Sequence, residues 1–186
     1  NGHEVHLVYD QALFDDKNYL SIPWAAKLLD QKDAVIQRII ELEPDLVGFH
    51  VQTVQYHEMR DMSEKIKKYY NVPIIFGGIH PHSSPEMTLL EHDPAVDMIC
   101  LSEGEYPLLE LCESIEKGEI DYSIKNLWFR LEGGSLIKNE TRPLIKNLDD
   151  LPTIDKDLFE PHVSIRNSYL STPSRGCPYV CNFCSL

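Results

Sequence analysis

Short apolar runs alternate with longer amphipathic segments along the first two thirds of the chain. The apolar runs, rich in Val, Ile, Leu and aromatic residues, predict buried strands at residues 4–9, 45–50, 72–76 and 97–101. The amphipathic segments predict helices at residues 33–43, 59–69, 85–92 and 106–117. Strands that alternate with helices and are apolar along most of their length are typical of a parallel sheet with helices on both faces. The pattern therefore predicts a Rossmann-like or flavodoxin-like α/β fold.

The pattern changes after residue 121. Residues 126–131 and 135–138 flank Gly133 and Gly134, and they predict a β-hairpin with a glycine turn. The next stretch, residues 142–162, mixes prolines with acidic and scattered apolar residues, which is typical of an ordered connector. We therefore predict an α/β domain, a hairpin with its connector, and a final short segment, at residues 1–121, 122–167 and 168–186.

Composition narrows the possible partners. The formal net charge is −13, and this argues against nucleic-acid binding, because phosphate backbones are recognised by clustered Lys and Arg. No apolar run approaches the roughly 20 residues that a membrane span requires, so we expect no span. A small molecule or another protein domain is the expected partner.

The loops that follow the predicted strands are the first candidate site. In open parallel sheets, ligands bind at the carboxyl ends of the strands. The candidate residues are Val51, Gln52, Thr53, Gly77, Gly78, His80, Pro81, Ser102, Glu103 and Gly104. Glycines after a strand allow close backbone approach, and a helix start offers free amide groups, although each loop taken alone is equally typical of an ordinary turn. The chain has no GxGxxG or GxxxxGKS sequence, so no motif supports a nicotinamide or nucleoside-triphosphate site.

The last dozen residues hold the second candidate site. Cys177, Cys181 and Cys184 have the spacing CxxxCxxC, which allows three thiolates on one loop to bind three irons of a cubic cluster and leave the fourth iron open. A structural zinc site completed by a distant group such as His162 is the alternative, although zinc sites more often pair CxxC with a second CxxC or HxxxH. The odd count of five cysteines fits a disulfide framework poorly.

The cysteine loop is similar to the cluster loop of radical S-adenosylmethionine enzymes. Phe183 precedes the third cysteine and Arg175 with Gly176 precedes the first, as in that family. The order of motifs, GxxxQT, GGxHP, SEGE, a proline-containing connector and CxxxCxxC, resembles a cobalamin-binding domain joined to a radical S-adenosylmethionine domain. The resemblance implies three cofactors: a [4Fe-4S] cluster on the three cysteines, S-adenosylmethionine on the open iron, and cobalamin. It also implies that residues 168–186 are the truncated start of a (β/α) barrel.

The same resemblance assigns roles to the strand-end loops. Gly77, Gly78, His80 and Pro81 would line the nucleotide tail of cobalamin, and the remaining candidates would lie beside the corrin ring or border the cavity. The chain lacks a DxHxxG segment, which supplies a cobalt-ligating histidine in other cobalamin domains. We therefore expect no histidine of this chain on the lower face of the cobalt.

The implied function is the cobalamin-binding portion of a radical S-adenosylmethionine enzyme. Its reaction would be either radical methyl transfer or the anaerobic oxidative cyclisation of magnesium-protoporphyrin IX monomethyl ester, with a small-molecule substrate and an electron donor. The catalytic residues would lie in the absent barrel, so we expect the chain alone to be inactive. Thiolate ligation of an oxygen-labile cluster predicts a cytoplasmic location.

Two alternatives remain open. One is a non-catalytic flavodoxin-like binding module with a terminal zinc site. The other is a radical S-adenosylmethionine enzyme whose N-terminal domain docks substrate without cobalamin. Corrinoid binding distinguishes the second alternative from the main hypothesis. The identity of the bound metal distinguishes the first alternative from it.

Overall fold

A computed structural model describes residues 2–8, 31–90, 95–160, 174–179, 181, 182 and 184. The chain divides into two compact units: Asn1–Glu43 with Asn147–Gly176, and Pro44–Lys146 with Cys177–Leu186. No helix within these described ranges combines the length and the apolar character needed to cross a membrane.

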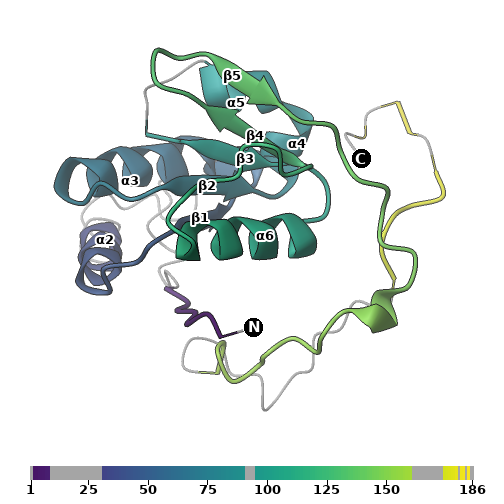
Figure 1. The fold of residues 1–186 in the computed structure, drawn as a ribbon, viewed down its shortest axis with the longest axis horizontal. Helices are drawn as coiled ribbons and strands as arrows, with labels where there is room; N and C mark the ends of the chain where they lie inside the picture. Colours follow the sequence, from purple (N-terminus) through teal and green to yellow (C-terminus); the bar gives the residue numbers. More distant parts are fainter. Residues whose placement is uncertain are drawn as a thin grey trace, which may run out of the picture. The chain divides into compact units, whose positions relative to one another are not determined.

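The second unit is built on a five-stranded sheet with the strand order β1-β2-β3-β4-β5 (Figure 1). The strands are β1 (Val47–His50), β2 (Ile74–Gly77), β3 (Met98–Cys100), β4 (Leu127–Arg130) and β5 (Leu136–Lys138). The first three are parallel to one another, as predicted. The hairpin of β4 and β5 adds to β3 in the antiparallel sense, so the sheet is mixed rather than wholly parallel. This pairing buries one face of β4, because Leu127 and Phe129, at alternate positions of the strand, lie in the core.

Both faces of the central strands are buried. On one face, Ile75, Met98, Leu127 and Phe129 form a core cluster with Leu111 of α6 (Glu105–Glu116). Residues of opposite parity on β2 and β3, namely Ile74, Phe76 and Ile99, are fully buried as well. Because successive side chains of a strand point to opposite faces, this burial confirms the predicted sheet covered on both sides.

The helices agree with the amphipathic pattern to within a few residues at most ends. They are α2 (Lys32–Glu41) in the first unit, and α3 (Tyr56–Tyr69), α5 (Pro85–Leu90) and α6 in the second. Two short elements were not predicted near the strand ends, the 3-10 turn η1 (Thr53–Gln55) and the helix α4 (Ile79–Ser83). Each is too short to show a helical period in the sequence.

The strand predicted at residues 4–9 is wrong where it can be checked. Residues 2–8 have neither helical nor strand structure, and Tyr9 lies outside the described residues. A strand needs a neighbour to pair with its backbone groups, and the described part of the first unit contains no strand. An apolar β-branched composition alone therefore did not produce a strand here.

Candidate functional site

The fold brings the predicted loops to one edge of the sheet. They follow the carboxyl ends of β1, β2 and β3, which are parallel and adjacent. Ligands of open α/β sheets bind at this end of the strands. We call this region the carboxyl edge, defined by residues 51–55, 77–82 and 102–104.

The first two loops of the carboxyl edge are joined through Val51. Its N–H donates to the Gly77 carbonyl at 2.7 Å, and its carbonyl accepts from the His80 N–H at 3.1 Å. The Val51 side chain is fully buried, whereas Gln52 and Thr53 are exposed. The backbone of Val51 therefore joins the two loops through hydrogen bonds. The side chains of Gln52 and Thr53 face the outside of the protein.

Gly78 is required by the contact between these loops. Its φ of +100° lies in the region that favours glycine, and a Cβ added there would lie 2.9 Å from the Val51 carbonyl oxygen. A Cβ on the neighbouring Gly77 would meet only Cys100 Cβ, at 3.9 Å. The close backbone approach predicted for Gly78 is thus an approach to Val51 within the protein.

His80 is the buried polar residue of the carboxyl edge. Its side chain is 7% exposed, its ring stacks on Tyr56 with 4.2 Å between the centroids, and its Nδ1 lies 3.4 Å from Thr53 Oγ1. Burial, with a smaller effect from nearby His57, lowers the pKa of His80, so the imidazole is neutral at pH 7. Its Nε2 atom is buried and has no hydrogen-bond partner among the described residues.

An unpartnered buried nitrogen is costly, because it has lost water and gained nothing in return. A polar group of a bound ligand would remove that cost. The orphaned Nε2 of His80 therefore fits a ligand with hydrogen-bonding groups at this edge, and cobalamin carries such groups. Pro81, the next residue, is also buried.

The second and third loops are joined by a residue that the sequence did not single out. The Ser102 N–H donates to Nδ1 of His82 at 3.2 Å, and Ser102 itself has a left-handed φ of 62°. His82 lies two positions after the predicted His80, and that spacing was the only sequence signal for it. The three predicted loops are thus linked in series through Val51 and His82.

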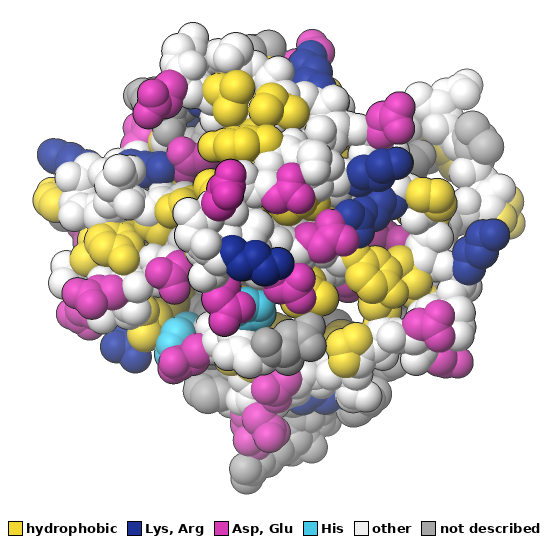
Figure 2. Space-filling view, in the orientation of Figure 1, with side chains coloured by type: hydrophobic (Ala, Val, Ile, Leu, Met, Phe, Trp, Pro, Cys, Tyr) yellow, Lys and Arg dark blue, Asp and Glu magenta, His cyan; other side chains and the backbone are white. Residues whose placement is uncertain are grey.

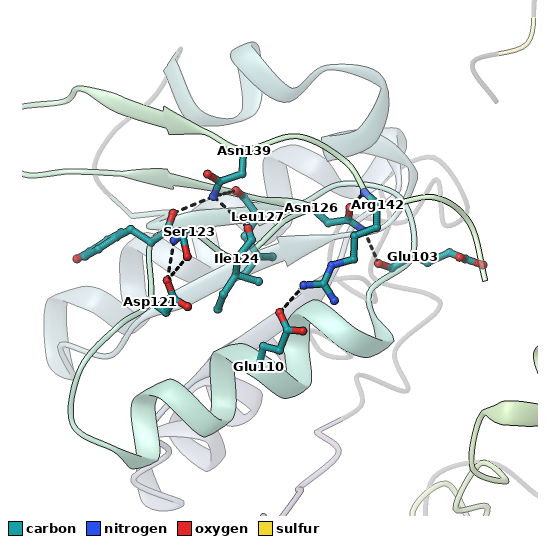
Figure 3. Close-up of polar contacts among 10 residues, drawn as sticks. Glu103, Glu110, Asp121, Ser123, Ile124, Asn126, Leu127, Asn139 and Arg142 are labelled. Atoms are coloured by element: carbon teal, nitrogen blue, oxygen red, sulfur yellow. Dashed lines mark hydrogen bonds and ion pairs between the residues drawn. The ribbon is translucent and has the colours of Figure 1, made fainter. Parts of the chain in front are cut away.

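Glu103 has protein partners on both its backbone and its side chain. Figure 3 shows the contact between its backbone carbonyl and Asn126. Its carboxylate accepts from the Ile145 N–H at 2.6 Å, and its carbonyl accepts from Asn126 Nδ2 at 2.9 Å. Gly104 then provides the N-terminal boundary of α6. The sequence predicted Glu103 as a cofactor contact and gave no sign of these longer-range hydrogen bonds.

Cys100 and Cys112 are set apart from the terminal cysteines by burial. Burial raises the pKa of the Cys100 thiol to about 11, with Glu105 adding to the shift, so this thiol stays protonated at neutral pH. Burial also raises the pKa of half-buried Cys112. Both therefore act as plain packing residues.

The cysteine loop, residues 177–184, has the donors for a cluster but no assembled site. Cys177, Cys181 and Cys184 are exposed free thiols, and the Cys184 N–H donates to the Cys181 carbonyl at 3.0 Å. Across the described part of the chain, no three His, Cys, Asp or Glu side chains are placed to hold a metal ion. Phe183 and His162 lie outside the described residues. The metal role of the three cysteines stays a prediction from their spacing and soft-donor chemistry.

The surface charge on one face of the molecule is mixed (Figure 2). On the face seen in Figure 2, Asp and Glu side chains are spread over the surface and interspersed with Lys and Arg. The net charge of −13 is therefore distributed rather than gathered into one acidic patch on that face.

Comparison with known families identifies the α/β region. The model of the B12 binding domain matches residues 2–112. The chain belongs to the B12-binding domain family. This B12-binding domain contains the whole carboxyl edge, so the family assigned from the motifs is confirmed.

Relatives of the B12-binding domain extend the match beyond it. An uncharacterized methyltransferase, PH0819 of Pyrococcus horikoshii, is 32% identical over 155 residues, which cover 81% of this chain and 33% of that protein. The anaerobic magnesium-protoporphyrin IX monomethyl ester cyclase of Cereibacter sphaeroides is 28% identical over 169 residues, covering 82% and 26%. The chain thus spans a third or less of the length of these two relatives.

Solved structures support the same fold. TsrM of Kitasatospora setae, a radical S-adenosylmethionine methyltransferase solved with cobalamin and a [4Fe-4S] cluster, matches with a TM-score of 0.54 and 22% identity over 66% of this chain and 23% of its own. OxsB, a cobalamin-dependent radical enzyme solved with aqua-cobalamin and S-adenosylmethionine, matches with a TM-score of 0.52 and 22% identity, covering 61% and 16%. At this identity the likeness concerns the fold.

Proposed function

We propose that the carboxyl edge binds cobalamin and that the chain is the cobalamin-binding portion of a radical S-adenosylmethionine enzyme. The observation that carries the proposal is the unpartnered, buried Nε2 of His80 at the carboxyl edge of a B12-binding domain. When bound, cobalamin supplies a cobalt centre that can carry an alkyl group.

The residues of the edge would hold the cofactor in different ways. His80 would hydrogen-bond a polar group of cobalamin through Nε2, because its Nδ1 already faces Thr53. Its stacking on Tyr56 and its burial favour a position in the wall of the site rather than below the cobalt. Gln52, Thr53 and the 88% exposed Val54 would face the corrin ring.

The cysteine loop would bind the second cofactor. Cys177, Cys181 and Cys184 would ligate a [4Fe-4S] cluster, and its open iron would bind S-adenosylmethionine. The exposed thiols support this role, because metal binding commonly organises a site that is not preformed. Free thiols of this kind fit a reducing compartment such as the cytoplasm.

Radical methyl transfer is the favoured reaction, and it is supported by the 32% identical relative named as a methyltransferase. The cyclase at 28% identity supports oxidative cyclisation as the second candidate. In either case the substrate would be a small molecule and an external donor would reduce the cluster.

An anaerobic titration with hydroxocobalamin tests the cobalamin site. The bound corrinoid is followed by its absorption bands and by the cobalt retained after gel filtration, and about one equivalent is expected. Thr53→Trp places a large ring at the exposed edge and should weaken binding about tenfold or more, whereas Ser135→Trp in the β4–β5 turn should bind like the wild type. Absence of binding to the wild type would refute the cobalamin site and favour a substrate-docking domain.

Metal analysis after anaerobic reconstitution separates the enzyme from the zinc module. A brown protein with broad absorption near about 400 nm and about four irons per chain is expected for the cluster. Stoichiometric zinc in a colourless protein would instead establish the non-catalytic module.

A further inference from the structure

The loop after β3 is held from two sides by hydrogen bonds. On one side, the Ser102 N–H donates to His82 of the neighbouring loop. On the other side, Glu103 accepts hydrogen bonds from Asn126 and from Ile145, which belong to the start of β4 and to the segment after β5. The loop therefore contacts both the loop after β2 and the chain that leaves the sheet.

Asn126 joins the loop after β3 to the segment after β5. It is 2% exposed and has a left-handed φ of 72°, a conformation that asparagine tolerates better than most residues. Its Oδ1 accepts from the Arg142 N–H at 2.5 Å while its Nδ2 donates to the Glu103 carbonyl. One buried amide thus joins the loop after β3 to the segment after β5 (Figure 3).

Besides the bond from Arg142 to Asn126, three contacts hold the segment at residues 140–145, and one of them is the bond from Ile145 to Glu103. The Asn126 N–H donates to the Glu140 carbonyl at 3.0 Å, the Arg142 guanidinium pairs with the Glu110 carboxylate of α6, and the Ile145 N–H donates to the Glu103 carboxylate at 2.6 Å. The chain passes into the other compact unit after Lys146. Glu103 therefore makes one of the last contacts that the segment has before it leaves the sheet unit.

We propose that Glu103 is a positioning residue whose carboxylate fixes residues 140–145 to the loop after β3 and thereby links cofactor binding at the carboxyl edge to the order of residues 140–145. We call the hydrogen bond from the Ile145 N–H to the Glu103 carboxylate the clamp. The link to cofactor binding rests on the proposed function, whereas the clamp does not. If a ligand that contacts residues 102–104 tightens the clamp, the clamp must in turn favour that ligand, because coupling between two sites is reciprocal.

Hydrogen exchange of the chain without ligand tests the clamp. Glu103→Ala removes the acceptor, so amides of residues 140–146 should exchange about tenfold faster, which corresponds to the loss of one net hydrogen bond. Glu103→Gln keeps an amide oxygen that can accept from Ile145 and should restore most of the protection. Glu116→Ala, which removes an exposed carboxylate at the end of α6, serves as the control and should exchange like the wild type.

A second variant keeps the test decisive if Glu103→Ala does not fold. Ile145→Pro removes the donor N–H and leaves Glu103 in place, so it should release the same segment. Peptides covering β2 report whether the sheet remains folded in each variant. Wild-type protection at residues 140–146 in both Glu103→Ala and Ile145→Pro would overturn the clamp.

Hydrogen exchange with hydroxocobalamin tests the coupling separately. Saturating corrinoid should slow exchange at residues 140–146 about threefold or more in the wild type, and this effect should vanish in Glu103→Ala. A wild type that binds corrinoid without changing exchange in this segment would overturn the coupling. A wild type that binds no corrinoid would refute the proposed function, and the ligand-free comparison would still decide the clamp.

Discussion

The loops of the carboxyl edge hold one another through hydrogen bonds that the chain makes with itself, whereas the cysteine loop presents three exposed thiols. In the first region Val51 braces the loops after β1 and β2, and His82 joins the loops after β2 and β3. In the second region the described backbone is closed by a hydrogen bond from the Cys184 N–H to the Cys181 carbonyl.

The two regions illustrate two kinds of binding site, one formed by the fold and one formed by the metal that binds to it. The fold sets the geometry of the carboxyl edge before any ligand arrives, at the cost of left-handed residues and a buried unpartnered nitrogen. The cysteine loop supplies only donors, so a metal would have to set its geometry. Variants at the positions that join the loops of the edge, such as Gly78, should therefore change folding stability, and variants of the cysteines should change metal content alone.

The largest effect is expected at the cysteines. Replacing Cys177, Cys181 or Cys184 by Ala removes a ligand and should abolish cluster formation, measured as iron content and absorption after anaerobic reconstitution. Because these thiols are exposed, the free energy of unfolding should stay within about 0.5 kcal/mol of the wild type. Cys112→Ser is the control and should retain iron; full iron retention in any of the three alanine variants would contradict the cluster assignment.

The next effect is expected at Gly78. Gly78→Ala places a Cβ against the Val51 backbone in a conformation that disfavours side chains, and should lower the free energy of unfolding by about 2–3 kcal/mol. Gly77→Ala, whose Cβ meets an ordinary contact, should change it by less than about 1 kcal/mol. Chemical denaturation measures both, and equal stability of the two variants would show that the loop contact is not needed.

A smaller effect is expected from the titration of His80. Its pKa is lowered in the folded chain by burial, so the unfolded chain binds a proton first as the pH falls below the usual value of about 6.5. Stability should therefore decrease as the pH falls through that value and level off below the folded pKa. His80→Phe keeps a ring against Tyr56 but cannot titrate.

Urea midpoints at pH 7.5 and pH 5.5 measure this effect. The difference between the two midpoints should be smaller in His80→Phe than in the wild type. An unchanged pH dependence in His80→Phe would mean that His80 is protonated equally in the folded and unfolded chains.

The smallest effect on stability is expected at Val54. This side chain is 88% exposed, so Val54→Ser should change the free energy of unfolding by less than about 0.5 kcal/mol. The same change removes apolar surface from the proposed corrinoid edge and should weaken hydroxocobalamin binding by about twofold to fivefold. Unchanged affinity would place the corrin ring away from η1.

The sequence predicted those parts of the fold that local pattern controls. The parallel strands β1 to β3 are continuous apolar runs, and α3 and α6 have helical periods, so each was recognisable by itself. The antiparallel addition of β4 to β3 and the absence of a strand at residues 2–8 depend on which partner is available in space, and a single segment carries no signal for that.

The candidate site shows the same division. Gly78 and His80 were recognisable because they directly follow a predicted strand. His82 binds Ser102 from 20 positions away, and Asn126 binds Glu103 from 23 positions away. Polar contacts across such separations have no fixed spacing, so the sequence could not reveal them.

The outer strand of the hairpin has a consequence for association between molecules. β5 ends at Lys138, whose ammonium pairs with Glu86 and lies 5.0 Å from the centre of the Trp128 ring. A short edge strand with a charged lysine disfavours the pairing of a further strand, because the newcomer would have to desolvate the charge for few backbone hydrogen bonds. At β5 the sheet is therefore protected against edge-to-edge aggregation.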